Sequence, residues 1–274
     1  MVATTSAGVA ATLGYEDQEG APADEMLAAA ARIARGVEVP VTVDAEAGYG
    51  MQPAELVAAL RSAGAAGCNL EDTDHTVGGL RDPDHHAEWL RAVRQAASAD
   101  GYRLVINARV DVFLGPFLAG AGPETQEGLV PEAVRRANAY LEAGADLAFV
   151  EGPTSVEEVR RVCREVKGRV FYNQTGVSPR FSLAQMQELG IAVTIVPGAT
   201  FRATIEAVYD LAVALRDEGP LAEERFAERF KRHPLGDVHT FAGFDRIREW
   251  EAQYLPPEEA EKYADSVGHQ PTRT

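Results

Sequence analysis

Residues Val39–Gly50 read VPVTVDAEAGYG and indicate a buried strand with an acidic end. The stretch opens with apolar, mostly β-branched residues, which are typical of a strand buried on both faces of a parallel sheet. Asp44 and Glu46 follow, and an extended chain places alternate residues on the same side. Carboxylates at the end of a buried strand are costly without a positive partner. A divalent cation is the simplest partner that this pattern predicts.

Length and charge restrict the class of protein. The 274 residues suffice for one α/β barrel or two small domains. The net charge of −16 argues against nucleic acid and against an anionic membrane surface as partners. We find no apolar run of transmembrane length and no signal-peptide pattern. Cys68 and Cys163 form no metal-binding or disulfide pattern, so we expect a cytoplasmic protein.

Strand and helix patterns alternate along most of the chain. Ser155 with Glu158 three residues later predicts a capping box at the start of one helix. After Pro220 the pattern changes to helices alone. We count seven strand-like runs before that point, at residues 2–5, 39–43, 67–70, 104–108, 145–150, 170–172 and 193–196.

This alternation predicts a parallel sheet with helices outside it. A closed barrel of this type has eight strands. Polar residues follow several strands in succession, which favours a barrel over an open doubly wound sheet, where ligand residues gather near one switch point. We predict a barrel domain over residues 1–220 and an oligomer-forming helical extension over residues 221–274. The polar residues after strand ends are Ser6, Asp44, Glu46, Glu71, Arg109, Glu151 and Asn173.

Several segments, in order, resemble the isocitrate lyase/phosphoenolpyruvate mutase superfamily. The most specific is Asp44–Gly50, which fits Asp-x-(Asp/Glu)-x-Gly-Tyr-Gly. The weaker segments gain force in combination, and the match covers roughly residues 2–200. They are Thr5–Gly8, Gly14–Asp17, Asn69–Asp72, Asn107–Arg109 and Glu151-Gly152.

The resemblance implies a fold, a cofactor and a substrate class. The fold is a modified (β/α)8 TIM-type barrel with additional C-terminal helices, and the protein forms a homo-oligomer, a dimer or tetramer. The cofactor is Mg²⁺, with Mn²⁺ as the alternative, and the substrate is a small 2-oxo or 2-hydroxy carboxylic acid. By matching positions, Asp44 binds the metal directly, Asp17, Glu46 and Glu71 hold it through water, Ser6, Ala7 and Gly8 bind substrate oxygens, and Arg109 binds the substrate carboxylate.

Three departures from the family pattern matter. The first βα unit expected before Val2–Gly8 is absent, in agreement with the count of seven strands; a misassigned start, a truncation or another chain filling the gap would explain it. The second carboxylate is Glu46, where the family usually has Asp. The loop Thr73–Leu80 has neither the Cys of the lyase branch nor the Lys or Asn of the mutase branch's gating loop.

Other side chains after strands are candidates for substrate binding and catalysis. The planar fork of Arg109 matches a carboxylate, although a structural ion pair with Glu151 is an alternative interpretation. Asn173 and Thr175 are placed to bind a second substrate carboxylate, or they are satisfied loop residues. We therefore treat Glu151, Asn173 and Thr175 as candidate substrate contacts.

His75 is the titratable residue of the loop expected to close over the site. Because histidine exchanges protons near neutral pH, His75 in place of the missing Cys is a hypothesis for the proton donor. Glu71 and Arg109 complete the catalytic candidates. We predict an enolate mechanism with carbon–carbon cleavage, of lyase or decarboxylase type. The alternatives are phosphorus–carbon chemistry and a catalytically silent homologue that binds a small acid.

Overall fold

The computed structural model describes residues 1–274 except 121–122, 175–177, 237 and 260–274. The chain forms two compact units, Met1–Phe201 and Arg202–Thr274. The predicted division into domains at residue 220 stays a prediction. Thr175 lies outside the described residues.

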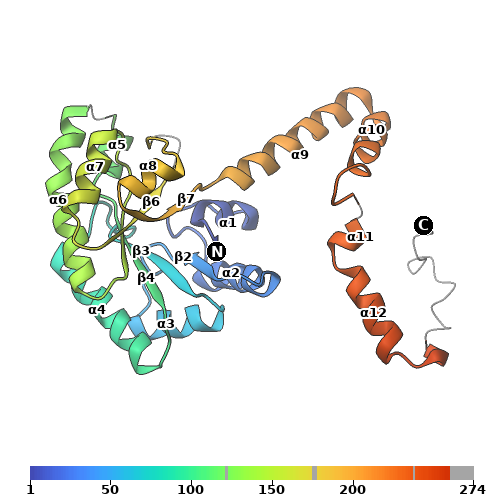
Figure 1. Ribbon diagram of the computed structural model, residues 1–274, viewed down its shortest axis with the longest axis horizontal. Helices are drawn as coiled ribbons and strands as arrows, with labels where there is room; N and C mark the ends of the chain where they lie inside the picture. Colours follow the sequence, from blue (N-terminus) through green and yellow to red (C-terminus); the bar gives the residue numbers. More distant parts are fainter. Residues whose placement is uncertain (121–122, 175–177, 237, 260–274) are drawn as a thin grey trace. The chain divides into compact units, whose positions relative to one another are not determined.

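Seven parallel strands form one sheet in chain order, which confirms the predicted fold class and strand count (Figure 1). The described strand pairings run from β1 to β7 without closing the ring between these two strands. The sheet is therefore a curled α/β half-barrel of the TIM type. The strands are β1 Val2–Ala3, β2 Val41–Asp44, β3 Gly67–Glu71, β4 Val105–Val110, β5 Leu147–Val150, β6 Arg169–Asn173 and β7 Ile191–Ile195.

Helices follow the strands and lie around the outside of the sheet. Ser155 and Glu158 form the expected capping box of α7. The segment Ser6–Leu13, for which no helix was predicted, forms α1. The first unit contains α1, α2 Ala23–Gly36, α3 Pro53–Ser62, α4 Pro83–Ala99, α5 Leu114–Leu118, α6 Pro123–Glu142, α7 Val156–Glu165 and α8 Leu183–Glu188, and the chain continues with α9 Ala199–Glu218, α10 Pro220–Phe230, α11 Val238–Phe241 and α12 Phe244–Tyr254.

The two faces of the sheet have different environments. Alternate strand residues such as Val43, Leu70 and Ile106 belong to the large apolar core shared with the helices. The opposite face carries a smaller cluster around Phe149 and Phe171. Because successive side chains point to opposite faces, the register also places Asp44, Asn69, Glu71, Asn107 and Arg109 on this second face. The polar residues thus share the inner face of the curled sheet.

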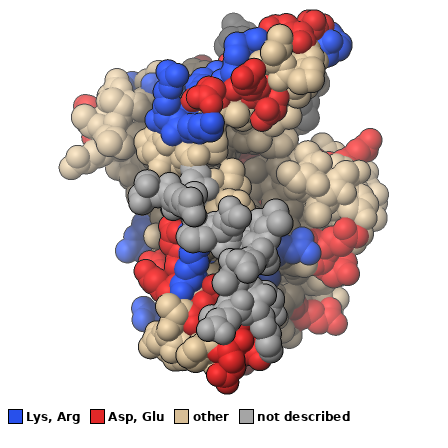
Figure 2. Space-filling model, turned by 90° about the vertical axis from the view of Figure 1, so that its right-hand side faces the viewer, with Lys and Arg blue, Asp and Glu red and all other residues tan. Residues whose placement is uncertain are grey.

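Asp and Glu side chains form several groups on the face drawn in Figure 2. There, Lys and Arg side chains lie between groups of Asp and Glu. Among the described helices, none combines the length and apolarity needed to cross a membrane.

His86 is a buried polar residue without an evident role in the sheet. It is 1% exposed, and neither ring nitrogen has a hydrogen-bond partner among the described residues. Its ring packs between Trp89 and Tyr140, with centroids 5.7 and 4.9 Å away. Burial, helped by the nearby Arg81 and Arg136, lowers the pKa of His86 to about 3. The imidazole is therefore neutral and carries an uncompensated desolvation cost.

We expect His86→Phe to stabilise the protein by about 1–3 kcal/mol, because it removes two unpaired polar atoms and keeps the aromatic packing. Urea unfolding at neutral pH measures the change, with the exposed neighbour His85→Phe as the control. A loss of stability in His86→Phe would show that the histidine nitrogens have partners in solution.

Candidate active site

Strands β3 and β4 bring a carboxylate and a guanidinium together at the carboxyl end of the sheet. Their register sets Glu71 opposite Arg109. Arg109 Nη1 lies 2.8 Å from Glu71 Oε2, and Arg109 Nε donates to Asp111 Oδ1 at 2.6 Å. Burial alone would lower the pKa of Arg109, but Asp111 and Glu71 raise it well above its ordinary value. The ion-pair partners are therefore Glu71 and Asp111, not Glu151 as the sequence suggested.

His75 reaches the same carboxylate from the loop after β3. Its Nε2 lies 2.7 Å from Glu71 Oε1, and the two side chains are 10% and 5% exposed. The hydrogen bond to Glu71 raises the pKa of His75. Burial raises the pKa of Glu71, against the opposing influence of Arg109 and His75. The 2.7 Å separation places Nε2 and Oε1 so that one proton can lie between them.

The loop that carries His75 is a short hairpin, Asp72–Arg81. Arg81 N donates to Asp72 O at 2.8 Å, and Thr73 pairs with Leu80 in an antiparallel bridge. Thr73 Oγ1 also donates to Asp111 Oδ2 at 2.6 Å. The hairpin is thus tied to the same aspartate that holds Arg109.

Glu46 lies on a strained loop after β2. Its φ is 47°, and Tyr49, Gln18 and Glu19 are also left-handed, with φ of 54°, 65° and 57°. Such backbone is unfavourable for residues other than glycine and concentrates at functional sites. Glu19 N donates to Glu46 Oε2, and Tyr49 N donates to Glu19 Oε1 at 2.6 Å. The side chain of Glu46 is longer than that of the Asp usual in the family, and it reaches the loop that contains Gln18 and Glu19.

Negative charge accumulates around Glu46. Its side chain is buried, with the residue 3% exposed. Burial, helped by the carboxylates of Asp17, Asp44 and Glu71 and opposed by the Glu19 N–H, raises the pKa of Glu46 to about 7. A cation at this position would relieve the repulsion.

Asp44, the last residue of β2, is held by uncharged groups. Its Oδ2 accepts from Ser6 N at 3.0 Å, and its Oδ1 accepts from Asn69 Nδ2 at 3.4 Å. Asn107 Nδ2 in turn donates to Asn69 Oδ1 at 2.7 Å. The described contacts orient the Asp44 carboxylate and leave its charge uncompensated. Asn69 and Asn107 lie in segments that resemble the family, but neither segment predicts this relay.

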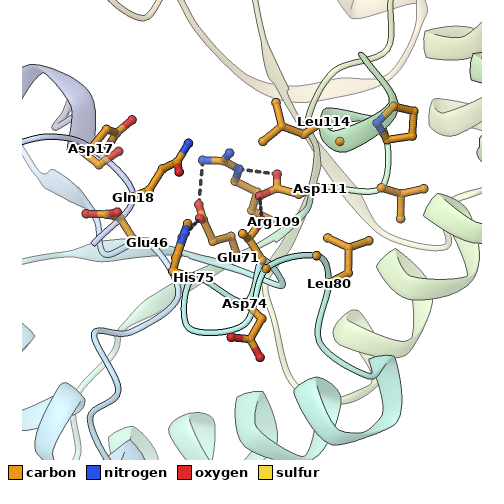
Figure 3. A pocket seen from close by; sticks show the side chains of 17 residues that line it. Asp17, Gln18, Glu46, Glu71, Asp74, His75, Leu80, Arg109, Asp111 and Leu114 are labelled. Atoms are coloured by element: carbon orange, nitrogen blue, oxygen red, sulfur yellow. Dashed lines mark hydrogen bonds and ion pairs between the residues drawn. The ribbon is translucent and has the colours of Figure 1, made fainter. Parts of the chain in front are cut away.

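A cavity of about 450 Å³ lies over these residues (Figure 3). In the view of Figure 3, Asp17, Gln18 and Glu46 lie on one side of Arg109, and Leu114 lies on the other. The cavity therefore combines an acidic side with a less polar one. Its lining comprises Ser6, Asp17, Gln18, Glu46, Glu71, Thr73, Asp74, His75, Gly78, Gly79, Leu80, Arg109, Asp111, Val112, Leu114, Gly115 and Pro116.

Other predicted site residues do not line this cavity. Asp44 contacts its lining residue Ser6 from the strand end. Ala7 and Gly8 lie in the first turn of α1, and the cavity lining does not include them. Asn173 Nδ2 donates to Glu151 Oε2 at 2.9 Å, and burial raises the pKa of Glu151 to about 6. The roles proposed for these residues remain predictions.

The carboxylates of this site suit a cation that is bound directly by only a few protein oxygens. Within the described ranges, no three His, Cys, Asp or Glu side chains are grouped to hold one metal ion. Mg²⁺ is commonly bound through one or two carboxylates and retains several waters. The carboxylates near Glu46 fit that mode of binding better than a closed all-protein site.

The phosphoenolpyruvate phosphomutase family profile matches residues 1–216. The chain belongs to this family. A 2,3-dimethylmalate lyase of Eubacterium barkeri is 29% identical over 258 residues, which are 89% of this chain and 82% of that protein. A chloroplastic carboxyvinyl-carboxyphosphonate phosphorylmutase of Arabidopsis thaliana is 31% identical over 257 residues, covering 89% and 71%.

A solved structure supports the same family. The trigonal crystal form of 2,3-dimethylmalate lyase, described as a PEP mutase/isocitrate lyase superfamily member, has a TM-score of 0.75 and 29% identity, with 92% of this chain and 82% of that chain covered. The superfamily recognised from the motifs is confirmed, as is the prediction of an enzyme from the superfamily of these carbon–carbon lyases.

We expect Glu46 to make the metal-free protein less stable as pH rises from about 4.5 to about 7. The folded protein binds the Glu46 proton more tightly than the unfolded chain, so this stabilisation is complete below the unfolded pKa and is lost through the folded pKa. Urea unfolding in EDTA across this range measures it. Glu46→Gln should flatten the decline, whereas the exposed Glu38→Gln should not; equal slopes in both variants would contradict the assignment.

Proposed function

We propose that this protein is a Mg²⁺-dependent enzyme that cleaves a carbon–carbon bond next to the carbonyl of a small 2-oxo or 2-hydroxy carboxylic acid. The observation that carries the proposal is that carboxylates around Glu46 without a cationic contact and the partly buried guanidinium of Arg109 line one cavity. The first set attracts a cation, and Arg109 attracts a carboxylate. Together they suit a substrate with adjacent carbonyl and carboxylate oxygens.

Asp44 and Glu46, with Asp17 and Glu71 acting through water, would hold the metal. When bound, Mg²⁺ supplies positive charge that stabilises an enolate oxygen. Manganese is the alternative ion because it also prefers oxygen ligands.

The protein's own groups supply binding and proton transfer. Arg109 is held by Glu71 and Asp111, so its remaining N–H groups are oriented toward one substrate carboxylate without reorganisation. The proton held between His75 Nε2 and Glu71 Oε1 would protonate the enolate carbon after bond cleavage. Ser6, which lines the cavity, would contact substrate oxygens, with Ala7 and Gly8 as further candidates.

Phosphorus–carbon chemistry is the second candidate, supported by the phosphorylmutase among the relatives. A phosphonate dianion needs several positive partners. Among the described cavity residues, His75 and Arg109 are the cationic candidates, and both are already engaged by carboxylates. This charge balance favours carbon–carbon cleavage. The opposing acids of the lining are Asp17, Glu46, Glu71, Asp74 and Asp111.

We also propose a homo-oligomer in the cytoplasm. Helix α9 buries none of its residues among the described part of the chain, and it exposes Ile205, Val208 and Tyr209. Exposed apolar faces of this kind mark association surfaces. Both cysteines are free, in keeping with a reducing compartment.

A product-release screen tests the proposed function. Release of pyruvate or glyoxylate is followed over 2-hydroxy, 2-oxo and phosphono acids with Mg²⁺. We expect turnover of a carbon–carbon substrate, its loss in EDTA and recovery on adding Mg²⁺. Asp44→Ala should lower kcat/KM by about 100-fold or more because a charge-stabilising group is disabled, whereas the exposed Asp24→Ala should not. Turnover of phosphono acids alone would favour the second candidate, and no turnover at all would favour a silent binding protein.

For the proton donor, we expect His75→Gln to lower kcat by about 100-fold or more, because glutamine cannot transfer the proton. The exposed His85→Gln serves as the control. Stopped-flow and steady-state assays on the substrate identified by the screen provide the measurement. Unchanged turnover in His75→Gln would assign the proton transfer to another group.

A further inference from the structure

Asp72, the first residue of the hairpin, is buried and carries a charge-assisted network. It is fully inaccessible to solvent. Its Oδ1 accepts from Asp111 N at 2.9 Å, and its Oδ2 accepts from Tyr140 OH at 2.8 Å and from Arg136 Nη1 at 2.9 Å. Tyr140 and Arg136 are not among the residues that line the cavity described above, whereas Asp111 is.

Arg136 connects this network to the other end of the hairpin. It lies on α6, outside the sheet, and is 7% exposed. The same Nη1 that contacts Asp72 also donates to Arg81 O at 2.9 Å, while Nε donates to Glu132 Oε1 at 2.8 Å. One nitrogen therefore bridges the two residues at which the hairpin leaves and rejoins the fold.

The contacts of Arg136 with Asp72 and Arg81 are connected to the proposed reactive groups in two ways. Asp72 fixes the backbone of Asp111, whose carboxylate holds Arg109 and Thr73. The hairpin itself carries His75 to Glu71. A displacement of the hairpin base would thus move His75, the group proposed to protonate the substrate.

General stability is a poor explanation for such a bridge. Buried ion pairs often contribute little net stability compared with apolar residues of the same volume. The guanidinium supplies several donors in a rigid plane, which suits simultaneous contact with a carboxylate and a carbonyl oxygen. This geometry serves orientation, and orientation of reacting groups strongly affects rate.

We propose that Arg136 is a positioning residue that clamps both ends of the Asp72–Arg81 hairpin and so fixes His75 for catalysis, while Arg109 keeps its own contact with Glu71. The kinetic part of this inference rests on the proposed function. The structural part does not, because the clamp can be measured without a substrate.

Hydrogen exchange with mass spectrometry tests the clamp. In Arg136→Met, we expect peptides covering the hairpin to exchange at least about tenfold faster, because the Arg81 N–H and Asp74 N–H bonds open locally. Peptides from β5 and α7 should keep their exchange rates. An even increase over the chain would show a general stabilising role, and an unchanged hairpin would show no clamp; either result overturns the proposal.

Two milder variants keep the test valid if Arg136→Met does not fold. Arg136→Lys retains the charge and should give intermediate hairpin exchange, and Tyr140→Phe removes one bond to Asp72 and should give a smaller increase. Arg135→Met is the matched control, since Arg135 is the exposed neighbour that also pairs with Glu132. Hairpin protection equal to the unmodified protein in both Arg136→Lys and Tyr140→Phe would likewise overturn the clamp.

Kinetics provide a second readout on the substrate identified by the screen. Arg136→Met should lower kcat by at least about tenfold and change KM much less, because Glu71 still holds Arg109 while the His75 hairpin is released. Arg136→Lys should restore part of kcat. A rise in KM without a change in kcat would contradict the positioning role. If the unmodified enzyme turns over no acid, the proposed function fails, while hydrogen exchange still decides the clamp.

Discussion

The partly buried positive charge of Arg109 stabilises the acidic inner face of this sheet. Glu71 and Asp111 contact its guanidinium, and the charges of Asp44 and Glu151 also help to raise the pKa of Arg109. Without this positive charge, carboxylates at the ends of buried strands would repel one another and would lose their hydration with no compensating interaction. The parallel register of β3 and β4 is what brings Glu71 and Arg109 together, so the topology of the sheet and the electrostatics of the site depend on each other.

The carboxylates fall into two groups with different chemical consequences. Glu71 and Asp111 are neutralised by Arg109, so they serve to orient it and, through Glu71, to hold His75. Asp44 and Glu46 have no cationic contact among the described residues and are held by backbone and amide N–H groups instead. Residues of the same type are thereby divided by their neighbours into carboxylates paired with Arg109 and carboxylates without a cationic contact, and this division underlies the roles proposed for them.

The sequence permits prediction of features that are local or periodic. The seven strands follow from apolar runs, and Asp44, Glu46, Glu71 and Arg109 follow from their positions just after such runs or at their ends. Features that depend on tertiary contacts could not be predicted from the sequence. Arg136 and Asp72 are 64 residues apart, and nothing in either segment indicates that they meet. An ion pair of Arg109 with Glu151 was the alternative interpretation of that arginine, whereas the strand register sets Glu71 opposite Arg109. The left-handed backbone at Glu46 and Tyr49 could not be predicted either, because residues other than glycine give no local signal for it.

The Asp72–Arg81 hairpin has its own internal hydrogen bonds in addition to its contacts with Glu71 and Asp111. Its ends are joined by the Arg81 N to Asp72 O bond and by the Thr73–Leu80 bridge, and its tip from Asp74 to Gly79 has its own internal hydrogen bonds. A segment with this architecture is a module: its tip can change in length or composition while the ends stay in register with β3 and α4. New chemistry can therefore be grafted onto an unchanged scaffold by exchanging the tip, and residues 72 and 81 mark the natural splice points for such loop transplantation between members of the family.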